Sequence, residues 1–359
     1  MDNPDLPVRK FEEFRYALLP DGTAEIRACR ACAPDCDVPS EVEGRPVSAL
    51  GFEAYAGFDF LESVTIPEGV VRLDRRVFAG CGALTEATLP RSLREVGEGL
   101  FADCEELTDV RIPPDHPVLA LVDGVLFDKK EGRLLWYPAG REDEAYAVPP
   151  GTRAIGEGAF TGNAALRRVS LPEGLETVGD LAFSGCLHLE EAVIPDTVTA
   201  IGLRAFSGCR DMRSVRLPAR LAALDLGAFQ HCVSLAEVTV PDGVAALPWE
   251  CFRHCTGLRR VSLPEGLTEI GEEAFSLCSA LERVTMPESL RRIGRLAFSG
   301  CVRLPRLALH AGVEEIGQDA FRNCHALELI VAEGSRAEAY CRAAGLRFAR
   351  VEKGGGFDA

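Results

Sequence analysis

An aromatic residue returns every 23 residues along most of this chain, and that spacing limits the folds open to it. A period within the roughly 20–50 residues typical of repeat proteins indicates a solenoid, in which each unit packs only on its neighbours. The spacing breaks once, between Phe101 and Phe160. The aromatic column comprises Tyr55, Phe78, Phe101, Phe160, Phe183, Phe206, Phe229, Phe252, Phe275, Phe298 and Phe321.

Two further columns run in phase with the aromatic one, which excludes a chance pattern. One column is proline: Pro67, Pro90, Pro113, Pro149, Pro172, Pro195, Pro218, Pro241, Pro264 and Pro287, with His310 in the next slot. The other column is apolar throughout: Leu50, Leu73, Val96, Ile155, Val178, Ile201, Leu224, Leu247, Ile270, Ile293 and Ile316.

Each unit reads as a short strand followed by a turn. Leu258 to Cys278 gives L-x-x-V-x-L-P-x-x-L-x-x-I-G-x-x-A-F-x-x-C. The alternating opening, closed by proline, predicts strands at 61–66, 84–89 and 107–112, and then every 23 residues past the interruption. The following turn, helical or irregular, is expected to place its Phe in the core. A glycine after the apolar column is expected to permit the backbone turn: Gly97, Gly156, Gly179, Gly202, Gly271, Gly294 and Gly317.

This motif resembles the BspA-like leucine-rich repeats, over about Phe14 to Phe348. The resemblance implies an α/β repeat, a leucine-rich-repeat solenoid with one parallel β-sheet on its concave face. With about eleven rungs spaced about 4.8 Å apart, the array would extend on the order of 50 Å. The resemblance also implies an interaction protein, and many members of the family are exposed on cell surfaces and act in adhesion.

We expect one continuous array rather than two domains, with a cap at each open end. The predicted organisation is an N-terminal cap at 1–48, the array at 49–333 with an insertion at 115–148, a C-terminal cap helix and strand at 334–351, and a flexible tail at 352–359.

Both caps have recognisable local signals. A Pro20-Asp21-Gly22 turn between two apolar alternations predicts a hairpin over about 14–28. Ser335 followed by Glu338 is a capping-box pattern that opens a short helix, which Gly345 can end before a last strand in 346–351.

The break between Phe101 and Phe160 holds 13 extra residues. Val122 to Phe127 and Leu134 to Tyr137 flank a polar Asp128–Gly132 segment, which predicts a hairpin. Similar insertions recur in the BspA-like family, so we interpret this one as part of the architecture. A dedicated ligand-binding arm is the alternative.

Charge and hydropathy exclude several classes of function. The formal net charge of −16 argues against a nucleic-acid binder, which depends on positive charge. No run of about 18 apolar residues is present, so we expect no membrane insertion. The features of an export signal are missing, so the expected location is cytoplasmic. The expected oligomeric state is a monomer. Exposure at the cell surface is the alternative if the chain is truncated.

The fourteen cysteines are expected to be free core thiols rather than disulfides or metal ligands. Two clusters keep a metal-binding alternative open. Cys29, Cys32 and Cys36 form C-x2-C-x3-C, which lacks a fourth ligand for zinc. A second cluster comprises His231, Cys232, Cys251, His254 and Cys255. We expect no cofactor and no catalysis, because phosphate-cradling, nucleophile-elbow, zinc-protease and calcium-loop motifs are missing.

Two surface anomalies break the repeat and are the candidate binding sites for a protein partner. In the outward strand position, Arg260, Arg283 and Arg306 follow one another in successive rungs, joined by Arg216 and Arg259. Like charges in parallel register repel, and an acidic partner would relieve that cost. Dispersal of the charge by nearby glutamates is the alternative.

The second anomaly lies three residues before the aromatic column, where most residues are polar. Leu203, Leu226 and Trp249 interrupt this position in three successive rungs. A contiguous exposed apolar stripe is typical of a protein contact; local packing around Asp225 and Pro248 is the alternative. The sequence therefore predicts a macromolecule-binding scaffold, most simply for protein–protein interaction, with a surface adhesin as the alternative and a metal protein or enzyme as the remote one.

Overall fold

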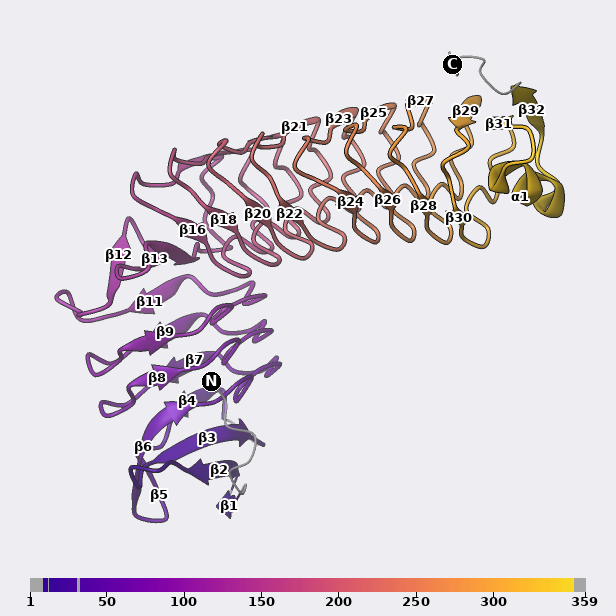
Figure 1. The fold of residues 1–359 in the computed structure, drawn as a ribbon. Coiled ribbons are helices and arrows are strands. Elements are labelled where there is room, and N and C mark those ends of the chain that lie inside the picture. The colour runs from indigo at the N-terminus through magenta and orange to yellow at the C-terminus, as the bar shows by residue number, and fades with distance from the viewer. Residues whose placement is uncertain (1–8, 12, 31–32, 352–359) are drawn as a thin grey trace. The chain divides into compact units, whose positions relative to one another are not determined.

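A computed structural model describes residues 9–11, 13–30 and 33–351 of the chain (Figure 1). The predicted tail at 352–359 and Cys32 therefore lie outside the described residues. The chain divides into two compact units, which we describe separately. The N-terminal unit contains Met1–Asp143 and Thr152–Ala165, and the C-terminal unit contains Glu144–Gly151 and Leu166–Ala359. The single continuous array stays a prediction.

The first ladder of strands lies where the repeat motif begins, inside the predicted windows. A typical strand of this ladder has a buried central residue between two outward-facing residues, as in Arg260–Ser262. In the N-terminal unit it consists of β4 (Asp35–Asp37), β7 (Ser63–Thr65), β9 (Glu86–Thr88) and β11 (Asp109–Arg111). In the C-terminal unit it consists of β15 (Ala145–Ala147), β17 (Arg168–Ser170), β19 (Glu191–Val193), β21 (Ser214–Arg216), β23 (Glu237–Thr239), β25 (Arg260–Ser262) and β27 (Arg283–Val284).

A second parallel ladder follows the apolar column, so the prediction of one sheet is wrong. In the N-terminal unit this ladder includes β6 (Arg45–Leu50), β8 (Arg72–Leu73) and β10 (Glu95–Val96). In the C-terminal unit it includes β18 (Thr177–Val178), β20 (Ala200–Ile201), β22 (Ala223–Leu224), β24 (Ala246–Leu247), β26 (Glu269–Ile270), β28 (Arg292–Ile293) and β30 (Glu315–Ile316). Two residues are too few to show an alternating pattern, which is why the sequence did not reveal these strands.

The two units together therefore contain about 14 turns of parallel β-solenoid, rather than about eleven. The additional turns come from segments without the repeat motif, such as β4, β15 and β31 (Glu328–Ala332), whose backbones still pair with the ladder. The α/β class also needs correction, because within the described residues only α1 (Arg336–Ala344) is an α-helix. The turns that carry the aromatic column are not helical.

The aromatic column forms the core of each unit. In the C-terminal unit the Phe206 and Phe229 rings stack with centroids 5.3 Å apart, and Phe229 and Phe252 stack at 5.7 Å. The side chain of Phe229 is completely buried. Its backbone N–H also donates to the Cys251 carbonyl in the next rung at 2.9 Å, so the ladder continues through the turn. Each ring thus packs between its counterparts in the preceding and following rungs.

The glycines after the apolar column serve close packing rather than a turn, contrary to the prediction. Gly97, Gly294 and Gly317 are outside the left-handed region, but a Cβ on Gly97 would lie 2.4 Å from the Arg75 backbone nitrogen. No side chain fits at that distance. The left-handed turn lies two residues past the aromatic ring, at Gly208 (φ 74°), for example.

The predicted hairpin in the insertion is present, and it continues the core of the N-terminal unit. β12 (Leu119–Val122), β13 (Val125–Asp128) and β14 (Arg133–Trp136) pair antiparallel in sequence, and β14 then pairs parallel with β16 (Ala154–Ile155). Trp136 packs edge-on against Phe101, with ring centroids 6.3 Å apart, and Tyr137 stacks on Phe160 at 4.8 Å. The insertion therefore supplies aromatic rings where the repeat is interrupted.

The predicted cap elements are also present. At the N-terminal end β2 (Phe14–Leu18) pairs antiparallel with β3 (Ala24–Cys29) and with β1 (Arg9–Phe11), and the short β5 (Glu41–Val42) pairs antiparallel with β6. At the other end, the Ser335 hydroxyl accepts from the Glu338 N–H at 3.2 Å and Gly345 adopts φ 66° to end α1. β32 (Phe348–Val351) pairs with β31 as the last strand.

We expect Phe229→Ala to lower the free energy of unfolding by about 3–5 kcal/mol, because the substitution leaves a ring-sized cavity between two stacked neighbours. Urea unfolding of the parent and the variant measures the loss. Val193→Ala is the matched control, since Val193 is 49% exposed and should change stability by less than about 0.5 kcal/mol. A Phe229→Ala loss below about 1 kcal/mol would contradict a buried, stacked column.

Candidate functional site: an arginine ladder and a three-rung groove

The structure places two of the three predicted arginines in register on the first ladder, and the third at the start of the next sheet. Arg260 on β25 is paired directly with Arg283 on β27, and Arg306 begins β29 (Arg306–Leu309). All three side chains are exposed. We call these three residues the arginine ladder.

Nearby carboxylates compensate the charges of Arg306 and Arg260, the outer residues of the arginine ladder, to different extents. Arg306 forms an ion pair with Glu328 at 3.1 Å. Arg260 is in register with Glu237 on its other side, yet no ion pair joins them within 4.0 Å. Among the described residues, Arg259, Arg260 and Arg283 have no ion pair, whereas the more distant Arg216 binds Asp196 at 2.9 Å. Within the arginine ladder, a glutamate therefore compensates Arg306 only, and the alternative of charge dispersal by nearby glutamates stays open.

A shallow groove lies beside the arginine ladder, and of its lining the sequence pointed only to Arg259. It crosses three successive rungs just before the first-ladder strands, at the residues that follow Cys255, Cys278 and Cys301. Its lining comprises Thr256, Gly257, Arg259, Ser279, Ala280, Val302 and Arg303. The other six residues share no motif, and only their rung positions bring them together, so the linear sequence did not reveal them as a site.

Arg259 and Arg303 give the groove its charge. Arg303 is 4.0 Å from Glu282, the limit for an ion pair, and Val302 is 43% exposed. The groove thus combines guanidinium donors, the Thr256 and Ser279 hydroxyls and one exposed apolar side chain, a composition suited to an anionic group on a polypeptide.

The apolar stripe is only partly a surface. Trp249 is 57% exposed, but Leu203 and Leu226 are half-buried. Asp225 accepts from the Leu226 N–H at 2.7 Å, which shapes the turn. The stripe follows the second ladder, which Figure 1 shows on the opposite side of the C-terminal unit from β21, β23, β25 and β27. The two candidate surfaces are therefore separate, and only Trp249 extends far into solvent.

Cysteines occupy a fixed position three residues after the aromatic ring and form hydrogen bonds. The Cys255 thiol donates to the Phe229 carbonyl at 3.1 Å, and the Cys278 thiol donates to the Phe252 carbonyl at 3.1 Å. The same bond joins Cys81, Cys104, Cys209, Cys232, Cys301 and Cys324 to the aromatic residue of the preceding rung. A small thiol here both fills the core and satisfies a buried carbonyl.

The structure gives the predicted cysteine–histidine cluster no metal-binding geometry. Cys232, Cys251 and Cys255 are completely buried, while the rings of His231 and His254 stack on each other at 4.8 Å in a partly exposed turn. Within residues 9–11, 13–30 and 33–351, no group of three or more His, Cys, Asp or Glu side chains could hold a metal ion. The alternative for Cys29, Cys32 and Cys36 includes Cys32, which is outside the described residues.

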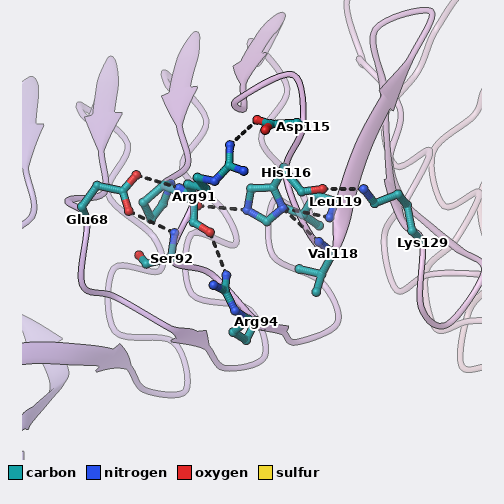
Figure 2. Close-up of polar contacts among 10 residues, drawn as sticks. Glu68, Arg91, Ser92, Arg94, Asp115, His116, Val118, Leu119 and Lys129 are labelled. Atoms are coloured by element: carbon teal, nitrogen blue, oxygen red, sulfur yellow. Dashed lines mark hydrogen bonds and ion pairs between the residues drawn. The ribbon is translucent and has the colours of Figure 1, made fainter.

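A buried histidine anchors the insertion in the N-terminal unit (Figure 2). His116 is completely buried at the start of the insertion. Its Nδ1 accepts from the N–H groups of Val118 (3.2 Å) and Leu119 (2.9 Å), so Nε2 carries the hydrogen that is donated to the Pro90 carbonyl at 3.0 Å. Lys129, from the turn after β13, donates to the His116 carbonyl.

This hydrogen-bond pattern requires a neutral imidazole. Burial lowers the pKa of His116, and the charges of Lys129 and Arg94 act in the same direction. On the adjacent turn, Glu68 accepts from the Arg91 and Ser92 N–H groups at 2.8 and 3.0 Å (Figure 2). The cluster satisfies its own donors and acceptors, which indicates a structural anchor rather than a ligand site.

We expect the repeat thiols to be unreactive in the folded protein. Burial raises the pKa of Cys232 and of Cys278 to about 12 each, so at pH 8 only about one such thiol in ten thousand is the nucleophilic thiolate. A chromogenic thiol reagent at pH 8 should react slowly with native protein. In denaturant without reductant it should recover close to all fourteen. A large shortfall after denaturation would indicate disulfides or bound metal.

We expect His116→Ala to lower the free energy of unfolding by about 2–4 kcal/mol at pH 7.5, because the buried Leu119 N–H, the half-buried Val118 N–H and the buried Pro90 carbonyl lose their partner. The loss should shrink as the pH falls below about 6.5. In that range the unfolded parent takes up a proton that the folded parent does not, so the parent itself loses stability. Urea unfolding at pH 5.5 and 7.5 measures both effects. His325→Ala, at an exposed residue, is the control, and an equal loss for both variants would contradict the anchor.

Three solved structures resemble this chain in fold. A leucine-rich cell surface protein from Faecalibacterium prausnitzii is 21% identical, with a TM-score of 0.54, and the match covers 99% of this chain and 96% of that one. A leucine-rich repeat protein from Bacteroides ovatus is 21% identical (TM-score 0.56; 96% and 99% covered). One from Eubacterium ventriosum is 18% identical (TM-score 0.55; 87% and 92% covered).

A search of curated protein sequences finds no match. None of the described helices is long and apolar enough to cross a membrane. The family model described as the BspA type leucine rich repeat region matches residues 41–119, 144–259 and 245–339, in six copies. The chain therefore belongs to the BspA-type leucine-rich repeat proteins, as its repeat motif predicted.

Proposed function

We propose that this chain is a protein-binding scaffold whose arginine ladder recognises an acidic surface on its partner. The observation that carries the proposal is the direct pairing of Arg260 with Arg283, next to an Arg259 that also has no ion pair among the described residues. Neighbouring like charges on a sheet reduce stability. A chain of net charge −16 has many carboxylates that could have compensated them.

Arginine suits such a role because its planar guanidinium binds a carboxylate through two parallel hydrogen bonds. Exposed arginines also contribute disproportionately to protein interfaces. We propose no catalytic role, since the repeat columns account for most of the buried cysteines and the buried histidine anchors the insertion.

The apolar stripe is the second candidate surface, favoured by the 57% exposure of Trp249. Tryptophan is among the residues most enriched in interface hot spots. Its half-buried neighbours Leu203 and Leu226 reduce the apolar area that it offers, so we rank it below the arginine ladder.

The cellular compartment in which the chain binds its partner is a separate proposal. A row of buried thiols, each hydrogen bonded to a carbonyl, favours a reducing compartment such as the cytoplasm. An adhesin at the cell surface is the alternative, supported by the description of the F. prausnitzii neighbour as a cell surface protein. Fractionation of source cells with an antibody against the chain distinguishes the two.

We expect the triple variant Arg260→Ser/Arg283→Ser/Arg306→Ser to lose the partner while remaining folded. Affinity capture with the parent and the variant, at low and high salt, measures the effect. Binding by the parent should weaken as salt rises, because exposed charge pairs are screened over about 8–10 Å at physiological ionic strength.

The double variant Leu203→Ser/Trp249→Ser is the matched comparison. If the apolar stripe is the site, this variant loses the partner and salt matters little. Retention of the partner by the arginine variant would overturn the proposal. If both variants bind like the parent, the insertion hairpin of β13 and β14 becomes the next surface to test.

A further inference from the structure

The backbone around the groove differs from that of the two rungs directly before it. Two residues after Cys209 and Cys232, the N–H groups of Asp211 and Ser234 donate to the preceding rung, at 2.9 and 3.1 Å. The corresponding N–H groups at the groove belong to Gly257, Ala280 and Arg303. They have no acceptor among the described residues, which is also true of the equivalent N–H groups of Ala83, Glu106, His188 and Ala326.

A tighter turn accompanies the change. In the three groove rungs the preceding N–H bonds back within its own turn: Thr256 to His254 at 2.9 Å, Ser279 to Leu277 at 2.8 Å and Val302 to Gly300 at 2.9 Å. His254 and Leu277 adopt left-handed φ angles of 62° and 63°, as do Asp103, His231 and Asn323 in other rungs, whereas the third groove rung and the remaining rungs use glycine. Non-glycine residues in this region carry backbone strain, and such strain gathers at binding sites.

The groove therefore offers one unpaired backbone donor per rung in three successive rungs, bounded by the cations of Arg259 and Arg303. A backbone N–H group without a protein acceptor can donate a charge-assisted hydrogen bond to an anionic oxygen. Three rungs span about 10 Å, which an extended peptide covers in about three residues. The exposed side chain of Val302 adds an apolar contact, which a polypeptide can use more readily than a sulfated sugar can.

We propose that the groove binds an extended acidic segment of a polypeptide, with its carboxylates at Arg259 and Arg303 and its oxygens facing the Gly257 and Ala280 amides. The inference rests on the proposed function and specifies the partner's chemistry. Glu282, 4.0 Å from Arg303, is the internal carboxylate that an acidic ligand would displace.

The probe is a fluorescent Asp-rich decapeptide, titrated into the full chain and followed by anisotropy, with the Asn-substituted peptide as its matched control. We expect Arg259→Ser/Arg303→Ser to weaken binding by about tenfold or more, as expected for the loss of two charge-assisted contacts. Arg220→Ser/Arg336→Ser removes the same charge outside the groove and should bind nearly like the parent. Glu282→Gln should bind more tightly than the parent, a gain that misfolding cannot produce.

Chemical shifts of the Gly257 and Ala280 amides should change with the Asp-rich peptide and not with the Asn-rich one. The inference is overturned if the Asp-rich peptide does not bind, if the two double variants weaken binding equally, or if a sulfated oligosaccharide binds the groove more tightly than the peptide. None of these results decides the proposed function. The capture experiment with the Arg260, Arg283 and Arg306 variant tests that function separately.

Discussion

Stacking of one aromatic ring on the next holds successive turns of this solenoid in place. Phe206, Phe229 and Phe252 lie nearly parallel at 5.3 and 5.7 Å, and the chain must return to the same depth every 23 residues to keep them there. That return sets the register of both strand ladders. It also brings each cysteine thiol against the carbonyl of the preceding rung's ring, where a thiol is small enough to fit and can still donate.

Because the core repeats, differences between rungs are confined to the surface and the turns. A parallel ladder places equivalent residues side by side, so a substitution repeated in adjacent rungs becomes a patch. Arg260 beside Arg283 is such a patch, and it lacks the carboxylates that satisfy Arg306 and Arg216. The tightened turns at Thr256 and Ser279 are a second local change in the same rungs. Charge and unpaired amides therefore coincide in one part of the array.

The sequence predicted the features that repeat or carry a local signal: the Phe229 type of core position, the hairpin at 122–137 and the capped helix at Ser335. It did not reveal the two-residue strands such as β24, because a strand held by its neighbours needs no alternating pattern of its own. It misassigned Gly97, whose role depends on the distance to the Arg75 backbone. The sequence did not predict the groove, because Arg259 and Arg303 are 44 residues apart and only the stacking of rungs brings them together.

Amide hydrogen exchange, with and without the captured partner, is the sharpest test of whether the rungs around Arg260 and Arg283 form one recognition surface. We expect slower exchange in three segments at once, 256–262, 279–285 and 302–308, because a ligand across the rungs must contact all three. Protection centred instead on 203, 226 and 249, or spread evenly along the array, would contradict a recognition surface at these rungs.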